Sequence, residues 1–220
     1  MYANRRPMLT RLCLIVAIAI LLSGILPYTT QPVSASSSGV VISAIYTRGG
    51  SAGATYINKF VELFNAGSSP VNITGWTVRY ASSSATAWLT SGGQVATIPS
   101  FTLQPGQYYL IQGGSNTPGA GVALPAPDLV SSMNPGAAGG KFALFSDAAA
   151  CATATAVGCA SYVDFVGWGT ANAAETAVGL PHGLTESLSR KSSGCIDSDN
   201  NSTDFELRSA NARNSATTLN

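Results

Sequence analysis

Short apolar stretches, separated by turn-forming residues, recur along the chain from residue 40 onwards. They are rich in β-branched and aromatic residues, some alternate large and polar side chains, and no window shows sustained helical periodicity. We predict strands over residues 40–46, 59–65, 71–73, 75–80, 94–98, 101–103, 107–112, 141–146, 161–168 and 184–191. A series of short strands joined by turns is typical of a β-sandwich, so the predicted fold class is all-β.

The loops between these strands are rich in glycine, alanine and serine. The longest, residues 113–140, shows no periodic pattern. An unstructured loop of that length is unusual in a compact domain, so it is either a functional surface loop or a flexible insertion. Its larger apolar residues, Leu124, Leu129 and Met133, indicate that it lies against the body of the protein.

Residues 1–35 have the three parts of a secretory signal peptide. Three arginines precede an apolar run at 12–26, Pro27 closes the run, and small residues at 33–35 offer a cleavage site before Ser36. The run is shorter than the roughly 20 apolar residues that a membrane helix needs. We therefore predict a secreted or cell-surface protein. The alternative is an uncleaved N-terminal anchor, which would be its only attachment to a membrane.

Removal of the signal leaves enough chain for one domain, which we place at 36–220, with its core at about 39–205 and a flexible tail at 209–220. The signal holds three of the 11 lysines and arginines, so 8 remain against 10 aspartates and glutamates. This slightly acidic balance argues against nucleic acid as a partner, because phosphate binding needs a basic surface.

Three cysteines remain after the signal is removed. Cys151 and Cys159 bracket a loop of small residues and are predicted to form a disulfide, which suits an oxidising compartment. Cys195 is then left over. The alternatives are a bridge from Cys159 to Cys195 or a cysteine that pairs between molecules. A zinc site is not indicated, because there is no CxxC pair and His182 has no ligand spacing to the cysteines.

Little in the sequence points to catalysis. His182 is the only histidine, no G-x-S-x-G elbow is present, and the neighbouring proline and glycine predict a histidine on a surface loop. The glycine pairs at 113–114 and 139–140 lack the lysine and the helix of a phosphate-binding loop. We therefore predict that the protein is not an enzyme.

Two carboxylates, Glu62 and Asp164, lie in the middle of predicted strands among large apolar residues. Both should be buried and paired, with Arg79 and Arg190 as candidate partners. A structural ion pair is therefore the favoured interpretation. The alternative is a secreted hydrolase, because a glycosidase needs two carboxylates that face a sugar-sized cleft. A cleft holding both carboxylates would favour it, and burial of Glu62 against Arg190 would exclude it.

The segment 197–204 contains four residues with oxygen ligands, Asp197, Asp199, Asn201 and Asp204. The alternating spacing of the first three lets a loop wrap a hard cation such as calcium. The segment lacks the glycine, the terminal glutamate and the flanking helices of an EF-hand. The alternative is that these side chains bond their own backbone to hold a turn. No cofactor other than such a calcium ion is expected.

Seven motifs stand in order between about residues 39 and 205. They are VISAIY at 41–46, FVELFN at 60–65, VNITGW at 71–76, LQPGQYYL at 103–110, DFVGWG at 164–169, SLSR at 187–190 and the polar segment 197–205. This ordered set resembles the lamin tail domain, an immunoglobulin-like module that ends nuclear lamins and also occurs in bacterial secreted proteins.

The resemblance implies an immunoglobulin-like β-sandwich that binds or scaffolds and carries no catalytic residues. Its structural residues would be Glu62, Trp76, Asp164, Trp168 and Arg190. The partner would be an extracellular protein or a surface polymer. A filament role is not supported, because no coiled coil precedes the domain. The long loop and the cysteine loop look like insertions, where anything particular to this protein would lie.

Overall fold

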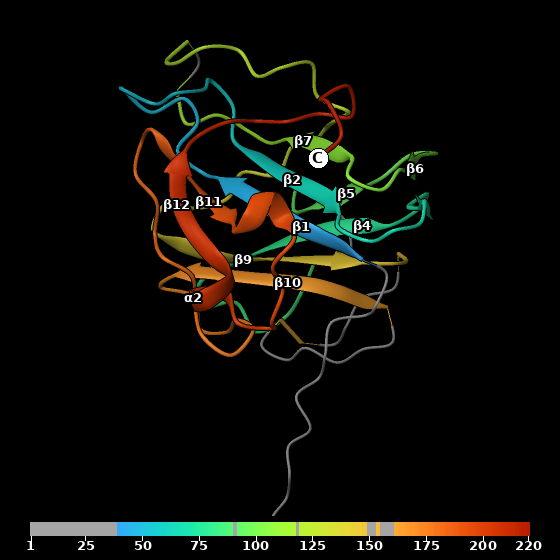
Figure 1. Ribbon diagram of the computed structural model, residues 1–220. Helices are drawn as coiled ribbons and strands as arrows, with labels where there is room; N and C mark the ends of the chain where they lie inside the picture. The colour runs from blue at the N-terminus through green and yellow to red at the C-terminus, as the bar shows by residue number, and fades with distance from the viewer. Residues whose placement is uncertain (1–38, 90–91, 118, 149–152, 155–160) are drawn as a thin grey trace, which may run out of the picture. The chain divides into compact units, whose positions relative to one another are not determined.

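Two β-sheets face each other across a shared hydrophobic core (Figure 1). The computed structural model describes residues 39–220 except 90–91, 118, 149–152 and 155–160, and these residues belong to one compact unit. The predicted signal segment lies outside the described residues. No helix in the described part of the chain is long and apolar enough to span a membrane.

The larger sheet has six strands in the order β12-β11-β1-β2-β7-β8. In chain order these are β1 (Val40–Tyr46), β2 (Phe60–Asn65), β7 (Tyr108–Gln112), β8 (Leu129–Val130), β11 (Glu186–Arg190) and β12 (Phe205–Ser209). Neighbouring strands are antiparallel except for β7 and β8, which are parallel. The central strands β1, β2 and β7 are rich in β-branched and aromatic residues, as strands buried on both faces require.

The second sheet has four antiparallel strands in the order β10-β9-β4-β5. They are β4 (Thr77–Ser82), β5 (Val95–Thr97), β9 (Gly139–Phe145) and β10 (Tyr162–Gly169). Three further elements are short: the paired strands β3 (Val71–Asn72) and β6 (Thr102–Leu103), a 3-10 turn η1 (Ser192–Gly194) and a one-turn helix α2 (Asn201–Asp204). A positive φ of 79° at Gly75 turns the chain just before β4.

Aromatic side chains dominate the core between the sheets. Trp168 is fully buried and stacks on Phe142 with the ring centres 5.4 Å apart, and Tyr80 lies beside both rings. Trp76 is 8% exposed and belongs to the same core. Each such side chain contributes about 1.5–3 kcal/mol by burial, so both predicted structural tryptophans lie where they stabilise the sandwich.

The C-terminal segment, residues 210–220, crosses the outer face of the larger sheet (Figure 1). Ala212 belongs to the same hydrophobic cluster as Phe60. Ser215 donates its backbone N–H to Asp128 at 3.0 Å, and the backbone N–H of Asn220 donates to the Gly106 carbonyl at 3.0 Å. The sequence predicted a flexible tail here. The structure differs, because these residues cover sheet surface that would otherwise be exposed.

The long loop at 113–140 is partly structured. Its residues 129–130 form β8 beside β7, and Val122 bridges to Tyr56. Met133 is buried and Leu129 packs against the main core, as expected from their apolar side chains. The loop therefore lies against the body of the domain.

Candidate functional site

Asp164 on β10 and Arg190 on β11 form an ion pair that joins the two sheets. Arg190 Nη2 lies 2.9 Å from both carboxylate oxygens, and both side chains are fully buried. The register of β1 shifts beside this pair, after Ile42. The Ile42 N–H donates to Asp164 at 2.5 Å, and its carbonyl accepts from Arg190 Nε at 3.2 Å. The ion pair thus satisfies backbone groups that the sheet leaves open.

All five N–H groups of Arg190 have an acceptor. Besides the bonds to Asp164 and Ile42, Nη1 donates to the carbonyl of Ile196 at 3.3 Å and to Asp197 at 2.8 Å. Burial lowers the pKa of Arg190, but the carboxylates of Asp164 and Asp197 outweigh this effect and raise the pKa overall. Arg190 is therefore a permanent internal cation whose donors are all used.

Glu175, which the sequence analysis did not single out, lies next to this pair. It hydrogen-bonds with the Tyr162 hydroxyl, accepts from the Phe165 N–H at 3.1 Å and accepts from the Asn201 amide at 2.9 Å. Burial and the nearby charge of Asp164 raise the pKa of Glu175 to about 9, so its carboxyl group is protonated at neutral pH. Its loop has no periodic pattern, so only the tertiary contacts reveal it.

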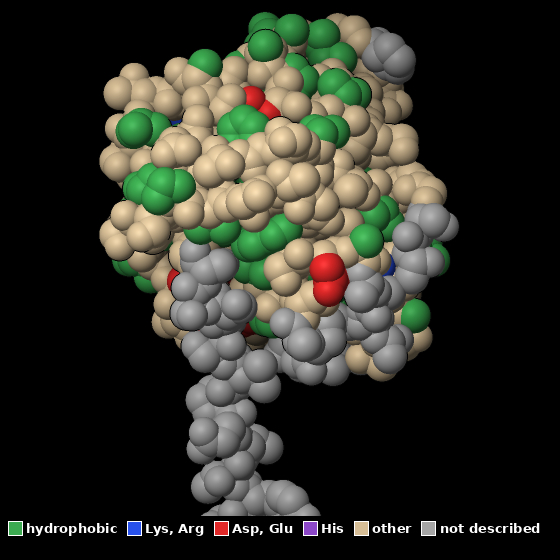
Figure 2. Space-filling view, turned by 90° about the vertical axis from the view of Figure 1, so that its right-hand side faces the viewer, with side chains coloured by type: hydrophobic (Ala, Val, Ile, Leu, Met, Phe, Trp, Pro, Cys, Tyr) green, Lys and Arg blue, Asp and Glu red, His purple; other side chains and the backbone are tan. Residues whose placement is uncertain are grey.

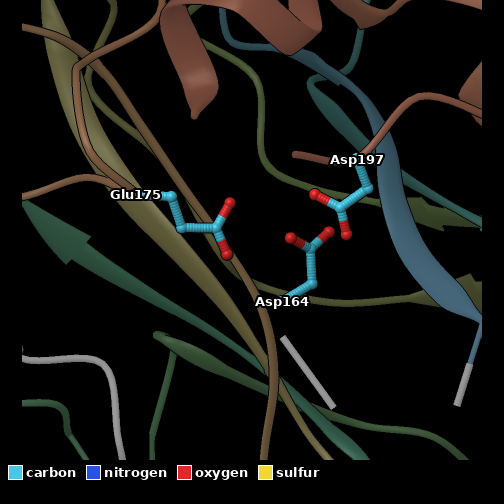
Figure 3. Close-up of side chains that lie close together, drawn as sticks. All are labelled: Asp164, Glu175 and Asp197. Carbon is cyan, nitrogen blue, oxygen red and sulfur yellow. The ribbon is translucent and has the colours of Figure 1, made fainter. Parts of the chain in front are cut away.

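Three carboxyl groups converge at this place (Figure 3). In the part of the chain that the structure describes, Asp164, Glu175 and Asp197 are the one acidic group whose oxygens lie within 4.8 Å of one another. Arg190 already neutralises two of them, and the third keeps its proton. The cluster is therefore a complete internal salt bridge with an added hydrogen-bond network.

The four predicted calcium ligands do not converge. Asn201 points into the protein, where its amide bonds backbone groups of β10. Asp204 accepts from the N–H and hydroxyl of Ser198 and so closes its own loop. Asp197 pairs with the buried arginine, and Asp199 is half-buried. The geometry matches the alternative interpretation, in which Asp and Asn side chains hold a turn, and does not support a calcium loop.

Glu62 on β2 forms the second buried ion pair, with a partner the sequence did not predict. Arg213 in the C-terminal segment donates to its carboxylate from Nη2 at 2.7 Å, from Nε at 3.1 Å and from the backbone N–H at 2.9 Å. Ser43 donates to the same carboxylate at 2.6 Å. Burial raises the pKa of Glu62, and Arg213 opposes that shift. The prediction that Arg79 or Arg190 pairs with Glu62 is therefore wrong.

Glu62 and Asp164 do not face a common cleft. Glu62 lies on the outer face of the larger sheet beneath the C-terminal segment, because its neighbours Val61 and Leu63 fill the core. Asp164 lies between the sheets, and neither carboxylate is exposed to solvent. Arg79 is buried on the other sheet and donates to backbone carbonyls. The geometry required for a two-carboxylate hydrolase is absent from these residues.

His182 is buried rather than on the surface. Its side chain is 2% exposed, and Nε2 accepts from the Thr47 N–H at 2.8 Å. Burial lowers the pKa of His182 to about 4, so the ring is neutral at physiological pH. The surface-loop prediction fails because the loop folds back onto the Tyr46 ring, whose centre lies 6.0 Å from the imidazole.

The cysteine predictions concern mainly residues that are not described. Cys151 and Cys159, the predicted disulfide, lie outside the described residues. Cys195 is described and is an exposed, free thiol after η1.

A pocket of about 420 Å³ opens where β11, β12, η1 and the C-terminal segment meet. We call it the arginine pocket; its lining residues are Ser189, Ser193, Arg208, Ser209, Asn211 and Arg213, together with the buried Arg190. Ser189 and Arg208 lie on the outer face of the sheet, because the alternate residues Leu188 and Leu207 pack into the core. None of the described residues that line this pocket is acidic.

An all-β, immunoglobulin-like sandwich held together by buried ion pairs is the class of protein that these observations define. The chain belongs to the lamin tail domain family, since the family's profile, described as Lamin Tail Domain, matches residues 33–170. No curated protein matches the chain.

Among solved structures, a DUF4876 family protein from Bacteroides thetaiotaomicron is similar to this chain. The two are 13% identical, with a TM-score of 0.48, and the similarity covers 77% of this chain and 70% of that chain.

Proposed function

We propose that this protein is an exported, non-catalytic binding module of the lamin tail type, which acts outside the cell on an extracellular protein or a surface polymer. The apolar run behind three arginines and the small residues before Ser36 support export. The family match supports a binding or scaffolding role over a catalytic one.

The observation that carries this proposal is the way the buried carboxylates are used. Glu62 and Asp164 are each enclosed with an arginine, and Glu175 is enclosed with Tyr162 and Asn201. A general acid or base must reach its substrate within hydrogen-bond distance, directly or through one water. Glu62 and Asp164 have no exposed surface, and Glu175 is only 4% exposed. The arginine pocket, by contrast, is open to solvent.

Two measurements test the proposal. Cell fractionation with mass spectrometry of the N-terminus should find the chain in the medium or at the cell surface, beginning at Ser36. Purified protein should then sediment with isolated cell-envelope polymers in a saturable way without releasing soluble products from them.

Enzymatic release of sugars or peptides would overturn the non-catalytic part of the proposal, provided that Asp164→Asn or Glu62→Gln abolishes the release in a folded variant. A cytosolic chain with an intact N-terminus would overturn the proposed location. In the binding assay, unfolded protein at the same concentration serves as the control for nonspecific sedimentation.

A further inference from the structure

The arginine pocket combines cationic and neutral hydrogen-bond donors, and none of the described residues in its wall is acidic. We infer that it binds an acidic sugar unit, that is, a sugar carrying a carboxylate, phosphate or sulfate group, as found in anionic surface polymers. This inference rests on the proposed binding function and names the ligand class for that function.

Arg208 provides the free donors of the pocket. Its side chain is 55% exposed and contacts Glu206 through Nε at 2.9 Å. Its two terminal amino groups make no hydrogen bond with the described residues, so they remain available as donors at the pocket wall. A guanidinium with unused terminal amino groups can donate two parallel hydrogen bonds to two oxygens of a carboxylate, phosphate or sulfate group.

Of the other two arginines in the wall, Arg213 can offer two further donors and Arg190 none. Arg213 lies against the Tyr108 ring, with its guanidinium carbon 3.9 Å from the ring centre, and keeps one unused N–H on each terminal nitrogen after bonding Glu62 and Tyr108. Arg190 has no unused donor. The Arg190 side chain is fully buried and points between the sheets to Asp164, so it does not reach the pocket. The Arg213 side chain is 19% exposed, and its unused N–H groups are the ones that can serve the pocket.

Neutral polar groups complete the wall. Ser193, Ser209 and Asn211 carry side-chain hydroxyl or amide groups that are not used in hydrogen bonds with the described residues, and Ser189 shares one bond with Ser187. Such groups suit the hydroxyls of a sugar. A volume of about 420 Å³ also falls in the range of small-ligand sites and exceeds what a bare inorganic anion requires.

Titration calorimetry on the purified protein tests this inference with glucuronate, glucose 6-phosphate and glucose 6-sulfate, and with glucose and inorganic phosphate as controls. We expect the three charged sugars to bind more tightly than glucose and than phosphate, and to bind more weakly as salt increases. Binding of glucuronate alone would assign the ligand to uronate polymers. Binding of the phosphate or sulfate sugars alone would assign it to phosphorylated or sulfated polymers.

Arg208→Gln should lower the affinity for the charged sugars by about tenfold or more, because a charge-assisted hydrogen bond is lost. The fold should stay intact, because the position is exposed. Arg48→Gln removes the same charge far from the pocket wall and is the matched control. Equal affinities of both variants, or phosphate binding as tightly as sugar phosphate, would overturn the inference. If no charged sugar binds while the protein still sediments with envelope polymers, only this inference fails and the proposed function stands.

Discussion

Buried cations in this protein are stabilised in two different ways. Arg190 and Arg213 pair with carboxylates, whereas Lys59 donates to the Asn134 side chain at 2.6 Å and to a backbone carbonyl at 2.7 Å. Burial, together with the nearby positive charge of Arg48, lowers the pKa of Lys59 to about 8. The ion pairs are therefore the places where removing one partner should be most costly.

Arg213→Ala should lower the free energy of unfolding by about 3 kcal/mol or more, because it leaves the fully buried Glu62 without its partner. Replacing both residues by apolar side chains, as in Glu62→Leu with Arg213→Met, should recover most of that loss. Chemical denaturation measures both. Arg208→Ala is the control, since its exposed ion pair is worth about 1 kcal/mol at most. Equal losses for the two arginines would contradict the prediction.

The buried histidine gives stability a defined dependence on pH. The pKa of His182 is about 4 in the folded protein and 6.5 in its ordinary state, so the unfolded chain binds the extra proton between these values. The contribution of His182 to the free energy of unfolding should therefore be complete above pH 6.5. It should fall as the pH drops towards 4, by up to about 3 kcal/mol.

His182→Gln keeps an acceptor for the Thr47 N–H and removes the titrating group. Denaturation curves of both proteins between pH 4 and pH 7 isolate the contribution of the imidazole. The original protein should lose more stability than the variant as the pH falls. Parallel losses would show that the imidazole does not titrate with a lowered pKa.

At the scale of elements, sequence reasoning missed two strands, the short β8 inside the long loop and the last strand, β12. Residues 205–209 alternate apolar and polar side chains, and the structure places them in β12, with Phe205 and Leu207 towards the core. The alternation in β12 is present in the sequence, but it is short and directly follows the polar segment 197–204, which was interpreted as a candidate calcium site. The C-terminal segment that follows has no such period, so its attachment depends wholly on tertiary contacts.

Deleting residues 210–220 should destabilise the domain and expose the outer face of the larger sheet. The deletion removes the partner of Glu62 and uncovers Phe60 and Tyr108. Hydrogen exchange should show lost protection in β2 and β7, where these residues lie. A shorter deletion of residues 218–220 keeps Arg213 and Ser215 and should retain most of the protection. Equal protection in all three proteins would mean that the segment does not bind the sheet.

On the scale of the whole molecule, only 10% of the residues are charged. The face in Figure 2 accordingly shows mostly uncharged polar and backbone atoms with scattered hydrophobic side chains. Several of the charges lie inside, where they join distant segments. The internal cation at the acidic cluster is thus an arginine, and it performs the crosslinking that a calcium ion performs in other extracellular modules.

Millimolar calcium should therefore leave the melting temperature unchanged. An ion that binds only the folded protein would raise the melting temperature. At the acidic cluster such an ion would have to displace Arg190 from Asp164 and Asp197. Calorimetry with calcium, with magnesium and with a chelator is the measurement. A rise that calcium produces and the chelator reverses would contradict this assignment.

The sequence by itself determined the all-β class, most strands and the buried tryptophans, because the burial of alternate residues in a strand is a local pattern. Tertiary structure decided which charges meet. Glu62 and Arg213 are 151 residues apart in the chain, and Glu175 reaches Asp164 only because its loop folds back over β10. A buried charge requires a partner, but local sequence does not say which segment supplies it. The packing of the sheets and of the C-terminal segment brings the partner of each buried charge into place, and the same packing forms the arginine pocket.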